Sequence, residues 1–300
     1  MRFSNAFLFA ASAIIWGSTW YAIIFQVENA DPLVSVSYRF ALAGILLYIF
    51  CKAMRLPMKF SFSVHIRFLL LGFTLFGMNY WLVYLAETKI ASGLVALIFS
   101  SMIFFNILFN RVLLKAPLRR ETIYAGILGL VGTLFVFMPA IVDFKAAGSE
   151  VLGLTLSLAA IVIASLGNIM AASIYKKQIP VFQTNAYGML YGALINMAIA
   201  LAMGKEFAVH FTWPYSLSLL YLAVCGSIFA FAAYLELLGR IGPDRAVYVL
   251  IVSPVIALVI STFLEGFRWS WYSVLGSVLI LTGNYLALKK KSKSKAAATH

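Results

Sequence analysis

Ten apolar stretches of about 18–24 residues constrain the fold of this chain more than any other feature. A helix of about 20 apolar residues crosses a hydrocarbon core roughly 30 Å thick, so each stretch predicts a membrane-spanning helix. The gaps between them are short and hold nearly all the charge, which leaves no room for a soluble domain. We predict an all-α membrane protein with ten transmembrane helices, at about 5–25, 33–51, 66–86, 90–113, 121–139, 151–173, 183–203, 215–238, 244–264 and 271–288.

The composition agrees with this assignment. Of the 300 residues, 63% are hydrophobic and 11% are charged, whereas soluble domains carry about 25% charged residues. The first stretch follows Arg2 and contains "AASA", as a secretory signal would, but its apolar run continues to Phe25. That length exceeds a typical signal core, and we expect an uncleaved first span.

The placement of positive charge predicts the orientation. If the N-terminus is cytoplasmic, most of the 23 Lys and Arg residues fall in inside segments. The outside loops then hold Lys89, Lys145, Lys205 and Arg268. This bias follows the positive-inside rule and predicts that both termini are cytoplasmic. The net charge of +13 is therefore explained without nucleic acid, and residues 289–300 read as a basic cytoplasmic tail near anionic lipid.

A shift of 150 residues aligns the two halves of the chain. Gly17 falls on Gly167, Leu85 on Leu235, and Gly126 on Gly276. Each half holds five predicted spans, and an odd number means that the second half enters the membrane from the opposite side. We predict a first five-helix repeat over 1–145 and a second, inverted five-helix repeat over 146–288. Inverted repeats are typical of transporters that bind substrate near the midplane between the halves.

Several motifs resemble a known family. These are "IIWGSTWYAI" in the first span, "SVSYRFALAGILL" in the second, and "AVYVLIVSPVIALVISTFLEGFRWSWYSVLGSVLILTG" over the last two. Together they are similar to EamA-type transporters of the drug/metabolite transporter superfamily, over essentially the whole chain. Phe104 and Lys115 stand where the repeat would place counterparts of Pro254 and Glu265. The resemblance implies transport of a small metabolite or drug.

Polar and aromatic side chains inside the spans are the candidate substrate-binding residues. In "WGSTW", Trp16, Thr19 and Trp20 share one helix face, and Asn168 lies near the corresponding position of the sixth span. The stretch fits either a helix-packing face or a cavity wall, and two polar breaks in corresponding spans favour the cavity wall. The candidate substrate-binding residues are Trp16, Thr19, Trp20, Arg39, Asn79, Tyr80, Tyr84, Asn168, Tyr187, Tyr191 and Tyr248.

Two charges and one proline have further expected roles. Arg39 lies about two turns inside the second span, and it either binds a substrate carboxylate or pairs with an outer acid such as Glu28 or Glu87. Glu236 is the only carboxylate that we expect inside a span, and it either carries a proton or pairs with Arg240 at i+4. Pro254 interrupts the ninth span and is a candidate hinge.

The function predicted from these features is secondary transport by alternating access through a central aromatic-lined cavity. We expect small amphipathic metabolites, above all hydrophobic or aromatic amino acids, to leave across a bacterial inner membrane. Efflux of drugs or planar organic cations, or transport of nucleoside-like metabolites, is the alternative. The glycine series Gly126, Gly129, Gly132 and the pair Gly188, Gly192 predict close helix packing or a homodimer contact. No constellation for an enzyme, a cofactor or a metal ion is found, and the lipid bilayer and a small-molecule substrate are the expected partners.

Overall fold

The computed structural model describes residues 3–114, 120–142, 147–175, 177–207, 212–241 and 248–288. These residues are almost entirely helical and contain no strand. Each of the ten predicted stretches is mainly helical where it is described, and the fourth is divided by a turn at Ser100 and Ser101 between α5 and α6. The helices are α1 (Asn5–Val27), α2 (Pro32–Ala53), α3 (Phe62–Leu71), α4 (Asn79–Glu87), α5 (Ser92–Phe99), α6 (Met102–Leu114), α7 (Arg120–Val142), α8 (Ala147–Tyr175), α9 (Val181–Ala202), α10 (Trp213–Leu220), α11 (Ala230–Ile241), α13 (Val249–Leu264) and α14 (Trp271–Leu288).

Seven helical stretches in the described residues are long and apolar enough to cross a membrane. They correspond to the first four predicted spans and to the sixth, seventh and eighth. The described parts of α7 and α13 form shorter apolar helices. Large hydrophobic side chains are exposed on many helices, as lipid-facing surfaces require. The architecture is therefore a bundle of apolar helices built to lie in lipid.

Short caps explain where several helices begin and end. The Asp31 side chain accepts a hydrogen bond from the Leu33 backbone nitrogen at 2.9 Å, and Pro32 follows at the first helical position of α2. The α13 helix ends at Glu265, and Gly266 then adopts a positive φ of 68°. A left-handed glycine directly after a helix is a common stop signal.

Two π-helical segments interrupt the third and eighth helical stretches. Segment η1 (Gly72–Met78) joins α3 to α4, and segment η2 (Tyr221–Phe229) joins α10 to α11. A shift of 150 residues places 72–78 on 222–228, which lies inside η2. Runs of π-helix are rare and usually occur at functional sites. The internal repeat of the sequence thus extends to an irregular backbone feature in both halves.

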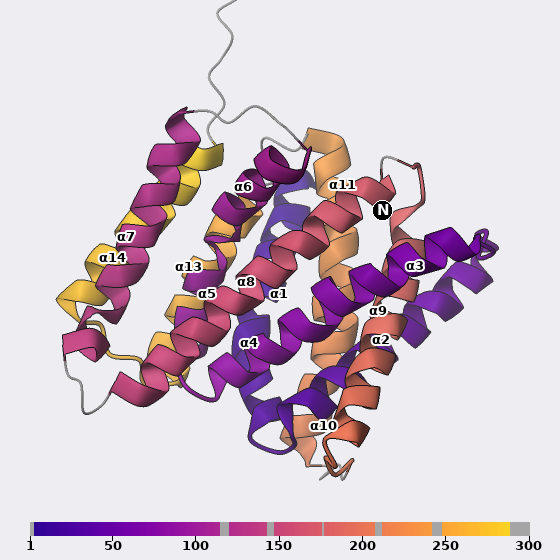
Figure 1. Ribbon diagram of the computed structural model, residues 1–300, viewed down its shortest axis with the longest axis horizontal. Helices are drawn as coiled ribbons and strands as arrows, with labels where there is room; N and C mark the ends of the chain where they lie inside the picture. The colour runs from indigo at the N-terminus through magenta and orange to yellow at the C-terminus, as the bar shows by residue number, and fades with distance from the viewer. Residues whose placement is uncertain are drawn as a thin grey trace, which may run out of the picture.

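Glycines allow close backbone contact at two helix crossings. A Cβ added to Gly276 of α14 would lie 2.5 Å from the Gly132 carbonyl oxygen of α7, and Figure 1 shows these two helices side by side. A Cβ added to Gly72 of η1 would lie 2.7 Å from the Gly188 carbonyl oxygen of α9. The expected close packing is confirmed at Gly129, Gly132, Gly188 and Gly192, whereas Gly126 makes only ordinary contacts with Phe104.

Other helices of the first half also pack against helices of the second half. Helix α1 packs on α13, η2 and α11 of the second half. Helix α8 correspondingly packs on α5, α6, η1 and α4 of the first half. Helices α2 and α9 lie against each other, as α7 and α14 do (Figure 1). The largest hydrophobic cluster draws on buried residues from both halves of the chain.

Candidate functional site

The "WGSTW" stretch of α1 contacts the π-helical segment η2. The Trp16 Nε1 donates to the Gly226 carbonyl oxygen at 3.3 Å. The Ser18 hydroxyl lies 2.6 Å from the Tyr221 hydroxyl. A Cβ added to Gly226 would lie 2.8 Å from Thr19 Cγ2. Trp16, Ser18 and Thr19 of α1 are thus in direct contact with the π-helical segment of the eighth stretch.

The same stretch also touches α13 and α5. A Cβ added to Gly17 would lie 2.7 Å from the Ile256 Cβ and 3.0 Å from the Ser253 carbonyl oxygen. Ser253 directly precedes Pro254, which is buried inside α13. The Trp20 ring packs on Phe99 with centroids 5.4 Å apart. The packing-face interpretation of "WGSTW" therefore has direct structural support, at a contact between the two halves.

Arg39 lies close to this contact and is buried, with 3% of its surface exposed. Its Nη1 donates to the Tyr84 hydroxyl at 3.4 Å and its Nη2 to the Ser227 hydroxyl at 3.5 Å, both long hydrogen bonds. The guanidinium carbon lies 4.8 Å from the centroid of the Tyr80 ring, within range of a cation–π contact. Arg39 Nε has no hydrogen-bond partner among the described residues. The charge is held by aromatic and hydroxyl groups from α4 and η2.

Gly167 and Asn168 of α8 mirror the "WGSTW" contact in the other half. A Cβ added to Gly167 would lie 2.9 Å from the Leu75 Cβ of η1. The Asn168 Nδ2 donates to Asn106 Oδ1 of α6 at 3.2 Å. The "WGSTW" stretch thus contacts η2 of the second half, whereas Gly167 contacts η1 and Asn168 bonds to α6 of the first half. Among the described residues, the two polar breaks are not found on facing walls of one cavity.

Tyr187 and Tyr191 of α9 belong to a separate aromatic cluster. The Tyr187 ring stacks on Phe68 with centroids 5.2 Å apart. The Tyr187 hydroxyl donates to the Met58 carbonyl oxygen at 2.7 Å. The Tyr191 hydroxyl lies 2.9 Å from His65 Nδ1. Sequence analysis did not select His65, which the structure places in α3 rather than in a loop.

The other candidates lie in different surroundings. Asn79 is buried, and its Oδ1 has no hydrogen-bond partner among the described residues. Tyr248 directly precedes α13, and the centroid of its ring lies 6.3 Å from the centroid of the Tyr285 ring. The side chain of Glu236 is 57% exposed, and its Oε1 lies 2.5 Å from Arg240 Nη2. The pairing alternative for Glu236 therefore has direct support.

The expectation that Glu236 is the only carboxylate inside a span is wrong. Glu87 is the last residue of α4 and lies within the third membrane stretch, with 8% of its surface exposed. The sequence boundary at residue 86 placed it in a loop, because the charge itself ends the apolar run. Its burial comes from helices α1, α2 and α8, which pack against α4.

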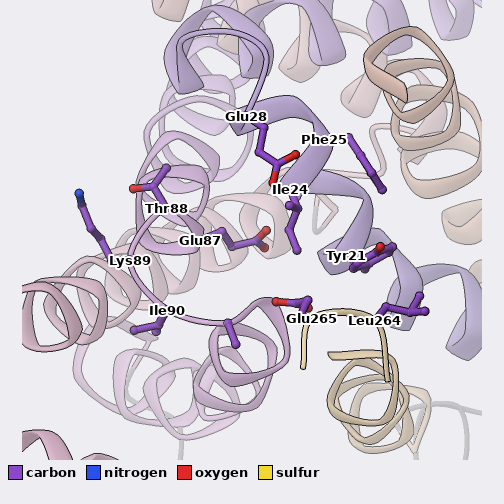
Figure 2. Close-up of a pocket in the computed structure, with 11 residues that line it drawn as sticks. Tyr21, Ile24, Phe25, Glu28, Glu87, Thr88, Lys89, Ile90, Leu264 and Glu265 are labelled. Carbon is purple, nitrogen blue, oxygen red and sulfur yellow. The ribbon is translucent and has the colours of Figure 1, made fainter. Parts of the chain in front are cut away.

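Glu87 lines a cavity of about 500 Å³ at the end of the bundle where α1, α4 and α13 finish. Figure 2 shows the carboxylates of Glu28, Glu87 and Glu265 directed toward the same space, and Lys89 extending away from it. None of the candidate residues chosen from the sequence is among those that line the cavity. The cavity adds an acidic site that the apolar patterning had no means of revealing.

Glu265 is anchored by the beginning of α5. The Ser92 backbone nitrogen donates to Glu265 Oε2 at 2.9 Å, and the Ser92 hydroxyl donates to the other carboxylate oxygen. A carboxylate at a helix N-terminus satisfies backbone N–H groups and complements the helix dipole. Among the described residues no group of three His, Cys, Asp or Glu side chains is placed to hold a metal ion.

Comparisons with known proteins agree with the membrane architecture. The sequence model of the EamA-like transporter family matches residues 4–138 and again 151–289. The chain is 29% identical over 287 residues to the uncharacterized inner membrane transporter YedA of Escherichia coli K12, covering 91% of this chain and 89% of YedA. It is 25% identical over 289 residues to a probable amino-acid metabolite efflux pump of the same organism, covering 91% of each.

A solved crystal structure shares the fold. It aligns with a TM-score of 0.67 at 17% sequence identity and covers 96% of this chain and 97% of the other. The likeness extends over the whole bundle, including both halves.

Proposed function

Because the chain belongs to the EamA-like transporter family, we propose that it exports small amphipathic metabolites, above all hydrophobic or aromatic amino acids, by alternating access. Membership of this family makes the protein an inner-membrane transporter and not an enzyme. The observation that carries the mechanism is the pair of π-helical segments at corresponding positions, with "WGSTW" against η2 and Gly167 against η1.

Two inverted five-helix repeats, 1–145 and 146–288, are part of this proposal. The family model matches each half separately. Helix α1 contacts η2 and α13, and α8 makes the corresponding contacts with η1 and α6. Such exchange of equivalent contacts is expected of two repeats related by a pseudo-twofold axis. With five spans in each repeat, both termini would lie on the cytoplasmic side.

Motion between the repeats would then change access to a site near their interface. The contact of Trp16, Ser18 and Thr19 with η2 joins the two halves. A π-helical segment and a buried proline both leave backbone groups that can exchange partners at low cost. We assign the hinge role to Pro254, beside the Gly17 contact, and extend it to η1 and η2.

The chemistry around this interface suits an amphipathic substrate. Trp16, Trp20 and Tyr80 supply aromatic faces, and Arg39 is the one Lys or Arg side chain among the buried described residues. A phosphate substrate would need a denser set of buried cations. The relative named as an amino-acid metabolite efflux pump supports the choice of amino acids. Tyr187 and Tyr191 would form a second aromatic binding position along the transport pathway.

The test is competition for uptake in liposomes that contain the purified protein. Labelled phenylalanine is offered with unlabelled amino acids, nucleosides or planar organic cations, with and without a pH gradient. We expect saturable uptake that is blocked by Phe, Trp or Leu and reduced about tenfold by Trp20→Ala or Tyr191→Ala, since each removes a stacking surface worth about 1 kcal/mol or more.

Other outcomes would change the assignment. Competition by planar cations but not by amino acids would replace amino-acid export with drug efflux. Acceleration by a pH gradient that is lost in Glu236→Gln would give Glu236 the proton-carrying role. Uptake that rises linearly without saturation would contradict carrier-type transport altogether.

A further inference from the structure

The cavity between α1, α4 and α13 combines acidic groups with aromatic walls. Glu28, Glu87 and Glu265 face it, while Lys89 is the single cationic side chain in its lining and points away (Figure 2). Tyr21 and Phe25 from successive turns of α1 form part of the wall, with their ring centroids 5.3 Å apart. The cavity is therefore negatively charged and partly aromatic.

Glu87 is a buried residue of the cavity lining and has no hydrogen-bond partner among the described residues. Both of its carboxylate oxygens are shielded from solvent and accept no hydrogen bond from any described residue. Arg39 and Glu265 are near enough to act on it electrostatically. No ion pair between Glu87 and Arg39 is formed, because Arg39 is bound to Tyr84 and Ser227 instead. A buried carboxylate in this setting is costly until a cation joins it.

The volume of the cavity and the placement of its carboxylates suit an organic cation. A volume of about 500 Å³ lies within the usual range for small-molecule sites. The carboxylates are not grouped closely enough to hold a metal ion among the described residues. Glu265 is already satisfied by Ser92, so Glu87 and the exposed Glu28 remain to bind a ligand. Tyr21 and Phe25 would cover an apolar or aromatic body attached to the charged group.

We propose that this cavity binds the primary ammonium group of the transported molecule, with Glu87 as the anion that receives it and Tyr21 and Phe25 against its apolar part. The Glu87 side chain turns a short way into the cavity to meet the ligand, and Glu28 attracts it at the rim. This inference rests on the proposed transport function and names the substrate chemistry: amines and amino acids enter the site, and carboxylates without an ammonium group do not.

Four matched probes test the proposal by equilibrium binding to the full-length protein in nanodiscs. Phenethylamine carries only the ammonium group, phenylalanine carries both charges, 3-phenylpropionate carries only the carboxylate, and phenethyl alcohol carries neither. We expect phenethylamine and phenylalanine to bind, and the other two to bind at least about tenfold more weakly. Glu87→Gln should weaken the two ammonium ligands by at least about tenfold, since removal of one buried charge partner costs more than 1.4 kcal/mol.

Two further variants keep the test independent of folding. Glu206→Gln removes the same charge from an exposed position beyond α9, outside the cavity lining, and should leave all four affinities unchanged. Glu28→Gln alters an exposed side chain at the rim. It should weaken phenethylamine by a smaller factor, even if Glu87→Gln lowers the yield of folded protein.

Two binding results would overturn the proposal, and one transport result would do so as well. One is equal affinity for 3-phenylpropionate and phenethylamine in the unaltered protein. The other is unchanged phenethylamine affinity in both Glu87→Gln and Glu28→Gln. This result counts against the site even if Glu87→Gln alters the pH dependence of transport. Phenylalanine uptake that survives in Glu87→Gln would reject this site but leave amino-acid export intact. Glu87-dependent amine binding without any amino-acid transport would support this site and reject amino-acid export.

Discussion

Arg39 joins three helical stretches and forms no ion pair with a carboxylate of the described residues. Its guanidinium contacts hydroxyls on α4 and η2 and the ring of Tyr80. An isolated buried charge is expensive in a membrane protein, and such residues usually mark a functional path. A residue kept only for stability would more often be replaced by an apolar side chain of similar volume. The surroundings of Arg39 therefore favour a role in binding or gating over a role in folding.

Arg39→Met should separate these two roles. We expect the melting temperature to stay within about 4 °C of the unaltered protein, because no ion pair is broken and an apolar side chain fills the site. Phenylalanine uptake should fall by about tenfold or more. The measurement is thermal unfolding in detergent beside initial uptake rates in liposomes. A fall in melting temperature of more than about 10 °C would instead make Arg39 a structural residue.

At the scale of helices, η1 and α9 cross with their backbones in contact. Gly72 and Gly192 leave room for the neighbouring backbone, and a Cβ on Gly192 would lie 2.8 Å from the Gly72 carbonyl oxygen. Helix contacts in membranes depend on such close packing, since lipid removes the usual hydrophobic driving force. The crossing holds a π-helical segment of the first half against the second half. Close packing there therefore affects both the stability of the bundle and the motion of the two halves.

Gly72→Ala should therefore destabilise the bundle. The added Cβ would lie 2.7 Å from the Gly188 carbonyl oxygen, and overpacking of this kind costs about 1–3 kcal/mol. We expect a melting temperature lower by about 2–10 °C. Gly148→Ala is the matched control, because a Cβ there meets nothing within 4 Å. Equal melting temperatures for the two variants would contradict the close crossing.

Sequence patterning predicted the helical stretches well but the site only in part. The apolar runs located every described helix because each run must satisfy the length of the bilayer. "WGSTW" and Asn168, selected from the sequence as polar breaks, lie inside the continuous helices α1 and α8, and Pro254 lies inside α13. The structure adds which segments the first two contact. Glu87 was missed because its position at a helix end resembles an ordinary loop acid. Only the helices packed around α4 bury it.

For the whole molecule, the proposed inverted repeat makes a prediction about sidedness. Met54, after α2, and Glu206, after α9, are both exposed and should lie on opposite sides of the membrane. A membrane-impermeant thiol reagent should label Glu206→Cys in intact cells and Met54→Cys only after permeabilisation. The unaltered chain, with Cys51 buried and Cys225 partly buried, provides the background. Labelling of both positions in intact cells would rule out this topology.

By itself, the sequence determined the helical class and the positions of the apolar helices, and it shows the likeness of its two halves at a shift of 150 residues. These properties depend on local composition and on the thickness of the bilayer, which act on each segment separately. Only the tertiary structure decided that "WGSTW" contacts η2 and Gly167 contacts η1. It alone also decided that the Tyr187 ring packs on His65 and that Glu87 is buried near Glu265 and Arg39. Those relations depend on how helices distant along the chain pack, and no local pattern encodes them.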